Sequence, residues 1–358
     1  MSIKYNGGYI PAVGADGTTL VANSSASTGV SWAGPTFAAG KNKIINGDFY
    51  INQRSFTSTT TSGVFMFDRW NSFFNGGTCT FTAQTFTLGT APVAGYEGTN
   101  FLQVVTSGQT GGNYCGPMQK IEDVRTFANQ TVTLSFWAKA NTGTPSIRVL
   151  ARQFFNSSAD VDNAFTTVTI SNSWVRYSMT ATIQSIAGKT IGTGSCLQII
   201  MLVSDGGSSL GIQNNTFQIW GVQLEAGSVA TAFQTATGTL QGELAACQRY
   251  YYRFGSGVGA QIFGSCFVFD STRCIATVKL AQTMRTTPTL DTTGTAANYR
   301  VYIGASNITS NSVPTLDVGG FGDVATVIFT SASTSTVGYA GYALTNGNNV
   351  YLGFSAEL

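Results

Sequence analysis

The chain has 358 residues, of which 9% are charged, with 18 Lys and Arg against 16 Asp and Glu and no histidine. A net charge of +2, with no window in which Lys and Arg gather between aromatic residues, argues against a nucleic-acid partner. The absence of histidine removes the usual general base, the commonest metal ligand and every Ser-His or Cys-His catalytic pair.

The composition predicts an all-β protein. Its 42 glycines and many Ser and Thr, together with abundant Val, Ile, Phe and Tyr, favour strands and tight turns over helices. No apolar run approaches the roughly 20 residues that a membrane helix needs, and the first residues lack the layout of a signal peptide. We therefore expect synthesis in the cytoplasm and no membrane insertion.

The six cysteines show no CxxC motif and no regular spacing. Free cysteine is among the most buried residue types, so these thiols are predicted to be apolar core groups. Cys266 and Cys274 flank the segment "FVFDSTR" and could face each other across a hairpin. Whether any disulfide forms stays open.

Residues 1–40 form the first predicted unit. Only Lys4 and Asp16 are charged there, and two short strands are predicted at 18–22 and 30–33. A segment this poor in apolar residues cannot bury enough surface alone. We expect it to be ordered by packing on copies of itself or on a larger particle.

Residues 41–236 are predicted to form consecutive β-strands, with no helical pattern between them. The stretch "TVTLSFWAKA" (131–140) alternates, with Val132, Leu134 and Phe136 on one face and Trp137 on the other. Further strands follow, each bounded by clusters of Gly, Asn, Ser or Pro. This spacing predicts an antiparallel sandwich, most simply a jelly roll.

Residues 237–254 are predicted to form a helical linker. Leu240, Leu244 and Cys247 recur at the i, i+4, i+7 spacing of a single apolar stripe. We expect this stripe to pack between domains or around a trimer axis. Cys247 has no base to activate it, so a structural role is predicted for its thiol.

Residues 255–358 return to β-patterning and form a unit about half the size of the first sandwich. They predict a smaller C-terminal β-sandwich. We expect trimerisation in this unit. Receptor binding is expected either here or in loops of the first sandwich, because loops on rigid β-scaffolds usually carry recognition.

Several motifs together resemble those of bacteriophage tail-fibre and appendage proteins that carry a carbohydrate-binding-module-like jelly roll. The motifs are "NKIINGDFYINQR" (42–54), "FDRW" (67–70), "LSFWAKA" (134–140), "WVRYSMT" (174–180), "GKTIG" (188–192) and "IWGVQLEAGSVATAF" (219–233). The segments "ELAACQRYYYR" (243–253), "VKLAQTMRTTPTL" (278–290) and "YLGFSAEL" (351–358) resemble the continuation of the chain and the smaller C-terminal β-domain of such proteins. The leader "GADGTTLVANSSASTGVSWAGP" (14–35) is similar to attachment segments of cyanophage fibres.

The resemblance implies an elongated homotrimer that belongs to the virion. Residues 1–40 would attach it to other virion proteins, and the outward β-domains would bind polysaccharide on the host surface. A structural capsid or tail appendage, or a connector without receptor specificity, is the alternative. Host, glycan identity, and tail or capsid attachment are not specified by the sequence.

The segment "FDRWNSFFNGG" contains the predicted glycan platform. An aromatic ring can stack on the apolar face of a sugar while neighbouring amides donate and accept hydrogen bonds. The candidate residues are Trp70, Asn71, Phe73 and Phe74, with Trp137 as a further contact. A core position for Trp70 is the alternative. Trp174 and Tyr177 lie on opposite faces of one strand and cannot both serve one site.

A structural calcium ion is the one cofactor that the resemblance raises. Jelly-roll carbohydrate modules with an "NGDF" motif often hold calcium near the first strand, and the matching positions are Asn46, Asp48 and Glu225. Calcium takes 6–8 oxygen ligands. Tyr50 stands where such modules often have a carboxylate, which is a departure from the pattern.

Enzyme activity is not expected. A polysaccharide depolymerase needs two carboxylates roughly 5–9 Å apart across a cleft. The 16 acidic residues are scattered, and the adjacent pair Glu122 and Asp123 would point apart on a strand. We therefore predict a non-enzymatic binding protein with no catalytic residues.

Overall fold

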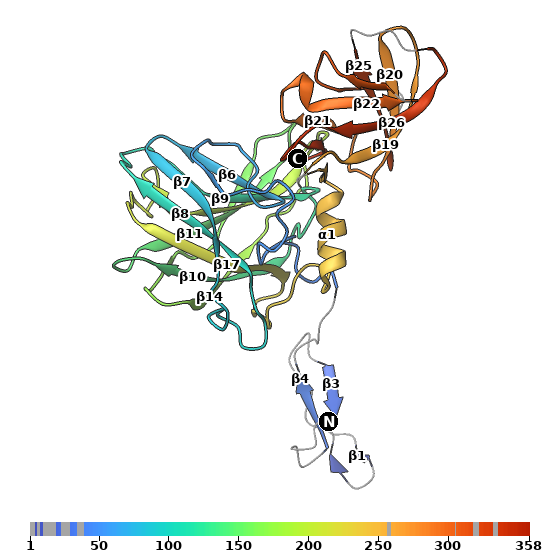
Figure 1. Cartoon of the computed structure of the whole chain (residues 1–358). Coiled ribbons are helices and arrows are strands. Elements are labelled where there is room, and N and C mark those ends of the chain that lie inside the picture. Colours follow the sequence, from blue (N-terminus) through green and yellow to red (C-terminus); the bar gives the residue numbers. More distant parts are fainter. Residues whose placement is uncertain are drawn as a thin grey trace.

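The computed structural model describes residues 4–5, 8–9, 19–22, 29–33, 39–255, 259–304, 306–317, 322–331 and 336–358. Figure 1 shows a hairpin near the N-terminus, a large β-sandwich, one α-helix and a smaller β-unit in chain order. The predicted all-β fold is confirmed. The homotrimer stays a prediction. No helix among the described residues is long and apolar enough to cross a membrane.

Two small hairpins make up the described part of the first unit. Strand β1 (Lys4–Tyr5) pairs with β2 (Gly8–Tyr9), and β3 (Thr19–Ala22) pairs with β4 (Val30–Ala33). The two longer strands nearly coincide with the short strands predicted at 18–22 and 30–33. In Figure 1, β3 and β4 stand clear of the large sandwich.

The large sandwich consists of two antiparallel sheets. Sheet I has the strand order β14 (Val175–Thr182), β10 (Thr131–Ala140), β17 (Thr216–Ala226), β8 (Asn100–Ser107), β7 (Thr78–Thr85) and β5 (Ser58–Thr59). Sheet II has the order β12 (Val161–Ala164), β11 (Ser146–Phe154), β15 (Cys196–Leu202), β9 (Tyr114–Glu122) and β16 (Ser204–Asp205). Strand β6 (Trp70–Asn75) also pairs with β9, and β13 (Val168–Thr169) with β11. From β8 to β11 consecutive strands alternate between the sheets, which is the jelly-roll pattern.

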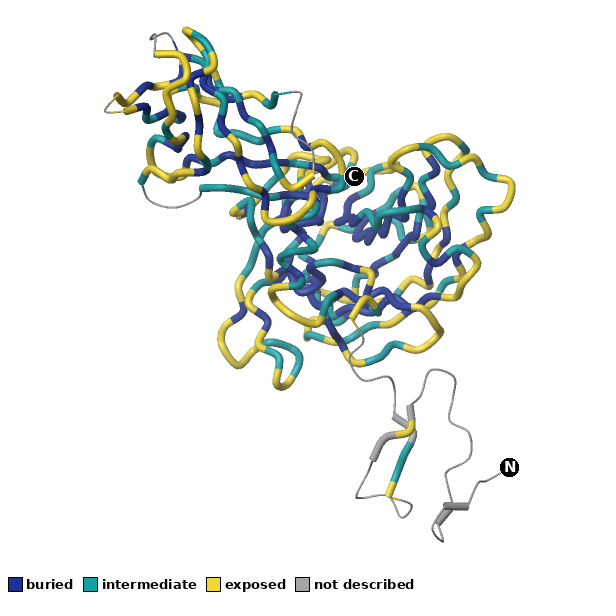
Figure 2. Tube along the Cα trace, turned by 90° about the vertical axis from the view of Figure 1, so that its right-hand side faces the viewer, coloured by how far each residue is buried: buried dark blue, intermediate teal, exposed yellow. Residues whose placement is uncertain are grey.

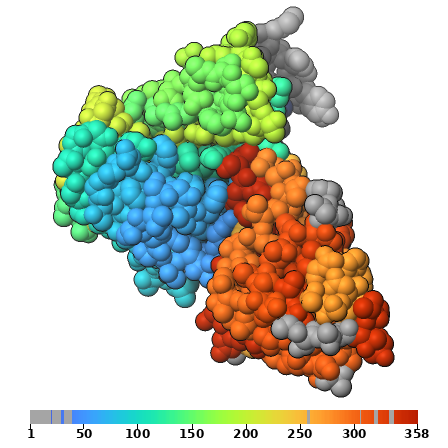
Figure 3. All heavy atoms as spheres, turned by 90° about the horizontal axis from the view of Figure 1, so that it is seen from above, coloured from blue at the N-terminus to red at the C-terminus, as the bar shows by residue number. Residues whose placement is uncertain are grey.

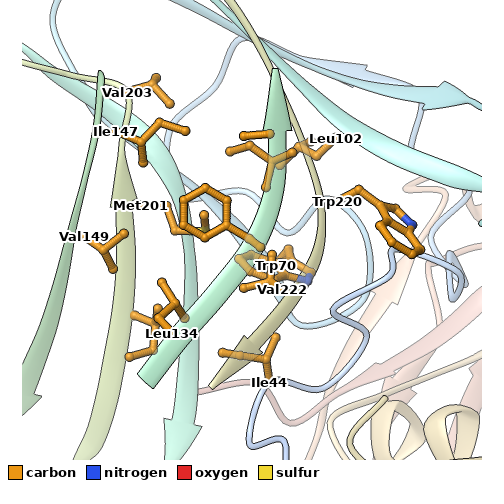
Figure 4. Packing of buried hydrophobic residues seen from close by; sticks show 14 of the residues in the cluster. Ile44, Trp70, Leu102, Leu134, Ile147, Val149, Met201, Val203, Trp220 and Val222 are labelled. Atoms are coloured by element: carbon orange, nitrogen blue, oxygen red, sulfur yellow. The ribbon is translucent and has the colours of Figure 1, made fainter. Parts of the chain in front are cut away.

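The core between the sheets follows from strand alternation. Val132, Leu134 and Phe136 are two residues apart on β10, and all three are fully buried. Facing them from sheet II are residues such as Val149 and Met201, which Figure 4 shows in the same cluster. Each fully buried side chain of this size contributes about 1.5–3 kcal/mol relative to exposure. Figure 2 shows this buried centre surrounded by exposed loops.

Helix α1 (Leu240–Gln248) forms where strand patterning stops. The Thr239 side chain accepts a hydrogen bond from the Gly242 N–H and caps the first turn. The predicted apolar stripe is only partly buried: Cys247 is fully buried, Leu244 is half-buried and Leu240 is 53% exposed. Within this chain, Leu240 therefore does not pack between the two units. Its expected place at a trimer interface stays a prediction.

The C-terminal unit contains two sheets. The three-stranded sheet has the order β18 (Tyr251–Phe254), β27 (Leu352–Ser355) and β21 (Thr289–Thr292). The seven-stranded sheet has the order β23 (Ser306–Thr309), β22 (Tyr299–Ile303), β26 (Ala340–Thr345), β19 (Ile262–Val268), β20 (Arg273–Lys279), β25 (Val324–Thr330) and β24 (Thr315–Leu316). A single 3-10 turn, η1, spans Ala296–Asn298. Cys266 and Cys274 lie on the paired strands β19 and β20, but their register partners are Ala276 and Val268, and both thiols are free.

The end of the chain joins the two sandwiches. Glu357 forms ion pairs with Arg69 and Arg54 of the first sandwich, and all three side chains are largely buried. The Lys120 ammonium donates to the Leu358 carbonyl oxygen at 2.6 Å. In Figure 3 the orange and red C-terminal unit lies directly against the blue and green sandwich. The two β-units are therefore joined by the predicted linker and also by contacts of the last residues of the chain with the first sandwich.

Candidate functional site

The structure separates the residues of the predicted glycan platform. Trp70 and Phe74 point into the large sandwich, whereas Asn71 and Phe73 lie on the outer face of sheet II. Trp137 lies on the outer face of sheet I. The five residues therefore do not form one surface.

Trp70 is a core residue and not a sugar platform. Its side chain is fully buried, and the indole Nε1–H donates to the Asn46 carbonyl oxygen at 2.9 Å. The ring packs on Phe49 with a centroid distance of 5.1 Å. The candidate role for Trp70 is therefore wrong, because the aromatic ring that the motif supplies is needed for folding.

The outer face of sheet II is apolar and closed by its own side chains. Phe73 stacks on Tyr114, with ring centroids 4.8 Å apart. Together with Leu210 these rings pack over a buried cluster made of Met118, Leu150, Ile200 and Leu202. Phe73 therefore covers apolar surface of its own sheet.

The predicted calcium ligands of the "NGDF" turn are engaged with protein groups. Asn46 Nδ2 donates to the carbonyl oxygens of Ile51 and Asp68, and its Oδ1 accepts from the Ile51 N–H. Asp48 accepts a hydrogen bond from the Tyr96 hydroxyl. These contacts tie the turn to the strands around it.

The third predicted ligand, Glu225, is held by a cation of the protein itself. Its Oε2 is 3.0 Å from the Lys41 ammonium, and its two oxygens also accept bonds from Thr231 and Gln223. Burial alone raises the pKa of Glu225, but these hydrogen bonds and Lys41 bring it below its ordinary value. In the part of the chain that the structure describes, no three Cys, Asp or Glu side chains are grouped as a metal site.

A pocket of about 280 Å³ lies beside the start of helix α1. Asp48, Glu97 and Glu243 contribute carboxylates to its lining, with Tyr50 and Tyr96. Burial raises the pKa of both Asp48 and Glu243, and the nearby Asp48 carboxylate raises the pKa of Glu243 further. Glu243 Oε2 accepts from the Asn46 N–H at 2.8 Å, so this carboxylate joins the helix to the first turn of the sandwich.

The outer face of sheet I carries a layer of aromatic rings. Trp220 is the centre of this layer, with ring centroids 5.4 Å from Trp137, 5.1 Å from Phe233 and 5.9 Å from Phe86. Figure 4 shows Trp220 apart from the aliphatic centre of the core. The bulge at Gly221, where φ is +64°, makes room for this packing, since a Cβ there would lie 2.7 Å from the Trp137 ring.

Beside the aromatic layer, polar side chains form one row across sheet I. The cross-strand register places Lys139 opposite Gln218, Gln218 opposite Gln103, Gln103 opposite Thr82, and Thr82 opposite Ser58. The strands that hold them lie side by side in Figure 1. Trp174 closes the row, because the Lys139 ammonium lies 5.4 Å from its ring centroid. We call these six residues the ladder face.

The ladder face leaves hydrogen-bonding groups available. Gln218 Nε2 donates to Gln103 Oε1 at 2.9 Å, and Gln218 Oε1 is buried without a hydrogen-bond partner. Within the described residues, Gln103 Nε2 and Lys139 Nζ donate to no protein acceptor. All six side chains are half-buried or exposed. Because Gln218 Oε1 is itself buried, a ligand on this face would be bound by the Gln103 amide N–H groups and the Lys139 ammonium.

Trp174 gives the ladder face its apolar end. The ring packs on Phe101 and Phe86, with centroid distances of 5.4 and 5.5 Å, and keeps part of its surface exposed. A ring fixed in this way can stack on the apolar face of a sugar without losing much side-chain entropy.

Two glutamines in the sequence point to the ladder face, although neither lies in the motif that predicted the glycan platform. Gln103 and Gln218 each lie between apolar neighbours, in "FLQVV" and "FQIW", and both stand at outward positions of the alternation. Only the register of five strands shows that the ladder residues meet in one row.

Cys247 lies away from both faces. Burial raises the pKa of its thiol well above the ordinary value, and nearby Asp68 and Glu243 raise it further. A thiol that stays protonated is a poor nucleophile.

Comparison with known proteins gives one family match. Residues 69–192 match the model of a carbohydrate binding domain. No curated protein matches the chain.

Solved structures of low similarity are also found. One is the family 11 carbohydrate-binding module of a cellulosomal cellulase of Clostridium thermocellum, at 14% identity, covering 49% of this chain and 98% of that one, with a TM-score of 0.30. Another is a xylan-binding domain from Paenibacillus barcinonensis, at 12% identity, 55% and 100% coverage, and a TM-score of 0.34. A third is the enzymatically active domain of tailspike protein 4 of bacteriophage CBA120, at 14% identity, 52% and 21% coverage, and a TM-score of 0.31.

Proposed function

We propose that the protein binds a glycan chain on the ladder face and does not cleave it. The observation that carries the proposal is the polar row from Ser58 to Lys139, which crosses sheet I and ends at the half-buried Trp174. Amide and hydroxyl groups in a row match the repeated hydroxyls of an extended sugar chain. The matched carbohydrate binding domain contains Thr82, Gln103, Lys139 and Trp174.

The biological setting that we propose rests on the motif resemblance. In it the protein is a fibre of a bacteriophage virion, attached through residues 1–40, and the glycan is polysaccharide of the host surface. A homotrimer would present three ladder faces, so that weak single sites are multiplied by avidity.

Binding of the purified protein to a polysaccharide panel tests the function. Gln103→Ala and Trp174→Ala should each weaken binding about tenfold or more, since a Trp at a contact surface often supplies a large share of the binding energy. Thr180→Ala, an exposed change on β14 of the same sheet, is the matched control and should bind as the wild type does. Equal binding by all three variants would disprove the site.

Release of oligosaccharides from a bound polysaccharide tests the non-enzymatic part. We expect no new reducing ends after prolonged incubation. Their appearance would instead support the depolymerase alternative.

A structural appendage is a second candidate, favoured by the surface of the C-terminal unit. Among the described residues of this small unit, six large apolar side chains are exposed: Ile262, Phe267, Phe269, Val337, Tyr339 and Tyr342. Phe267 and Phe269 pack on each other, and an exposed apolar surface of this kind can mark a contact with a partner. If they join copies of the chain, light scattering should show a trimer that Phe267→Ser weakens. A monomer at all concentrations would remove the physical basis of the fibre.

A further inference from the structure

The two sheets of the large sandwich differ in how their charges are paired. The strands of sheet II contain three cations and three carboxylates: Lys120, Arg148, Arg152, Glu122, Asp162 and Asp205. Arg148 pairs with Asp205 and Arg152 with Asp162, while Glu122 pairs with Arg249. The charges of sheet II are therefore largely neutralised within the protein.

The strands of sheet I contain two cations, Lys139 and Arg176, and one carboxylate, Glu225. Glu225 is buried and already neutralised by Lys41. Among the described residues, neither Lys139 nor Arg176 has a carboxylate within ion-pair distance. The outer face of sheet I therefore carries positive charge that the protein does not compensate.

Arg176 has a structural task that explains its position. Its Nη2 donates to Ser135 Oγ at 2.9 Å and to the Thr231 carbonyl oxygen at 2.6 Å. Its guanidinium lies over the Trp137 ring, 4.7 Å from the centroid. These contacts fasten the segment after β17 to sheet I.

Lys139 has no comparable task. Its side chain lies between Gln218 and Trp174, and its ammonium lies over the Trp174 ring and donates no hydrogen bond to the described residues. Three N–H donors are thus held at the end of a row where a sugar would stack. An ammonium at this place forms a charge-assisted bond with an anionic group on the ligand, which is stronger than a bond with a neutral hydroxyl.

We infer that the glycan of the ladder face is an acidic polysaccharide, and that Lys139 binds its anionic groups. This inference rests on the proposed function and adds the chemical class of the ligand to it. Gln103 and Gln218 contact the sugar hydroxyls, Trp174 stacks on a ring, and Lys139 selects for the charge.

Matched pairs of acidic and neutral polymers provide the test. The probes are polygalacturonate and hyaluronate with their carboxyl-reduced forms, and lambda-carrageenan with its desulfated form. The variants are Lys139→Gln, which removes the charge, and Lys139→Arg, which keeps it. Lys43→Gln, an exposed lysine outside the ladder face, controls for general attraction between the protein and a polyanion.

We expect at least one acidic polymer to bind about tenfold or more tightly than its neutral form. Lys139→Gln should abolish this preference, whereas Lys139→Arg and Lys43→Gln should keep it. The preference should also shrink with added salt, because an exposed ion pair is screened. Comparison of the carboxylated and the sulfated polymers shows which anionic group Lys139 binds.

Two other outcomes overturn the inference in distinguishable ways. If neutral polymers bind equally well and only Gln103→Ala and Trp174→Ala weaken them, the acidic class is wrong while the proposed function stands. If no polymer binds, or if binding survives both of those substitutions, the proposed function fails and the inference fails with it.

Discussion

The two outer faces of the large sandwich have the same backbone geometry and opposite chemistry. On sheet II, apolar side chains such as Ile200 are covered by Phe73 and Tyr114, and the arginines have carboxylate partners. On sheet I, the ladder face contains a buried, unpartnered amide oxygen on Gln218, and the Lys139 ammonium forms no ion pair with the described residues.

The difference indicates what each face is for. A face whose polar and charged groups form hydrogen bonds and ion pairs within the chain stabilises the fold and leaves few groups free to bind a partner. Unsatisfied groups cost stability, and a chain that keeps them in one row retains them for binding. Substitutions on sheet II should therefore change the unfolding free energy, whereas those on the ladder face should change affinity.

Ile200→Ala should have the largest effect. Ile200 lies on the outer face of sheet II, yet it is only 1% exposed, so the substitution creates a cavity under Phe73 and its neighbours. We expect a loss of about 3 kcal/mol in the free energy of unfolding. Urea denaturation measures it, and glycan affinity of the folded fraction should not change.

Val105→Ala on the outer face of sheet I is the matched control. Val105 is half-buried beside the ladder face, and its truncation should cost below about 1 kcal/mol. Equal costs for the two variants would mean that sheet I is as tightly covered as sheet II, which contradicts the comparison.

Lys41→Met should have the next largest effect, because it leaves the buried Glu225 carboxylate without its cation. We expect a cost of about 2 kcal/mol at neutral pH. Lys43→Met, two residues away and exposed, should cost almost nothing.

The sign of the pH dependence follows from the pKa of Glu225. This pKa lies below its ordinary value of 4.5, so its contribution to stability is present at neutral pH and is lost as pH falls through the folded pKa. In Lys41→Met the unpaired carboxylate takes up its proton at higher pH than in the wild type. The difference in unfolding free energy between the two proteins should therefore shrink toward about pH 4. A difference that grows in acid would show that Lys41 acts through something other than Glu225.

The double variant Gln103→Leu/Gln218→Leu should bind no glycan and still fold. It replaces a hydrogen-bonded pair and an unpartnered oxygen by apolar groups of similar size. The unfolding free energy should stay the same or rise by up to about 1 kcal/mol. A loss of more than about 2 kcal/mol would place the ladder among the structural networks of the fold.

Much of the fold follows from local patterns in the sequence. Alternation over 131–140 predicted β10 and its buried face, and the i, i+4, i+7 spacing of Leu240, Leu244 and Cys247 predicted helix α1. The helix stripe was predicted less well. Glu243 is buried in place of Leu240, because the carboxylate accepts the N–H groups of Asn46 and Thr237 and apolar periodicity does not describe such bonds.

The binding face could not be predicted in the same way. The motif with most aromatic residues supplied Trp70 and Phe74, which the core uses. The ladder residues are spread over residues 58–218, and each is ordinary in its own strand. Only the pairing of β10, β17, β8, β7 and β5 brings them together, and register is set by long-range contacts that one strand does not encode.

Arg152→Gln on sheet II should have the smallest effect. It tests whether an acidic polymer is attracted by the net charge of the protein or bound at the ladder face. Arg152 holds Asp162 by two bonds of 2.6 and 2.9 Å, and both side chains are partly exposed. Removing such a surface pair should cost about 0.5 kcal/mol in unfolding free energy. Affinity for an acidic polymer should change less than about twofold, because Arg152 lies on sheet II and not beside the ladder face, and salt screens the effect of a distant exposed charge.

Lys139→Gln and Arg152→Gln lower the net charge of the protein by the same amount. If an acidic polymer is attracted by net charge, the two variants should lose affinity equally, and the loss should vanish in salt for both. If the ladder face binds it, only Lys139→Gln should lose affinity, because only there does the charge stand in a row with the Gln218 and Gln103 amides and the Trp174 ring. Titration of both variants at two salt concentrations therefore decides whether the location of a charge or its total number determines binding.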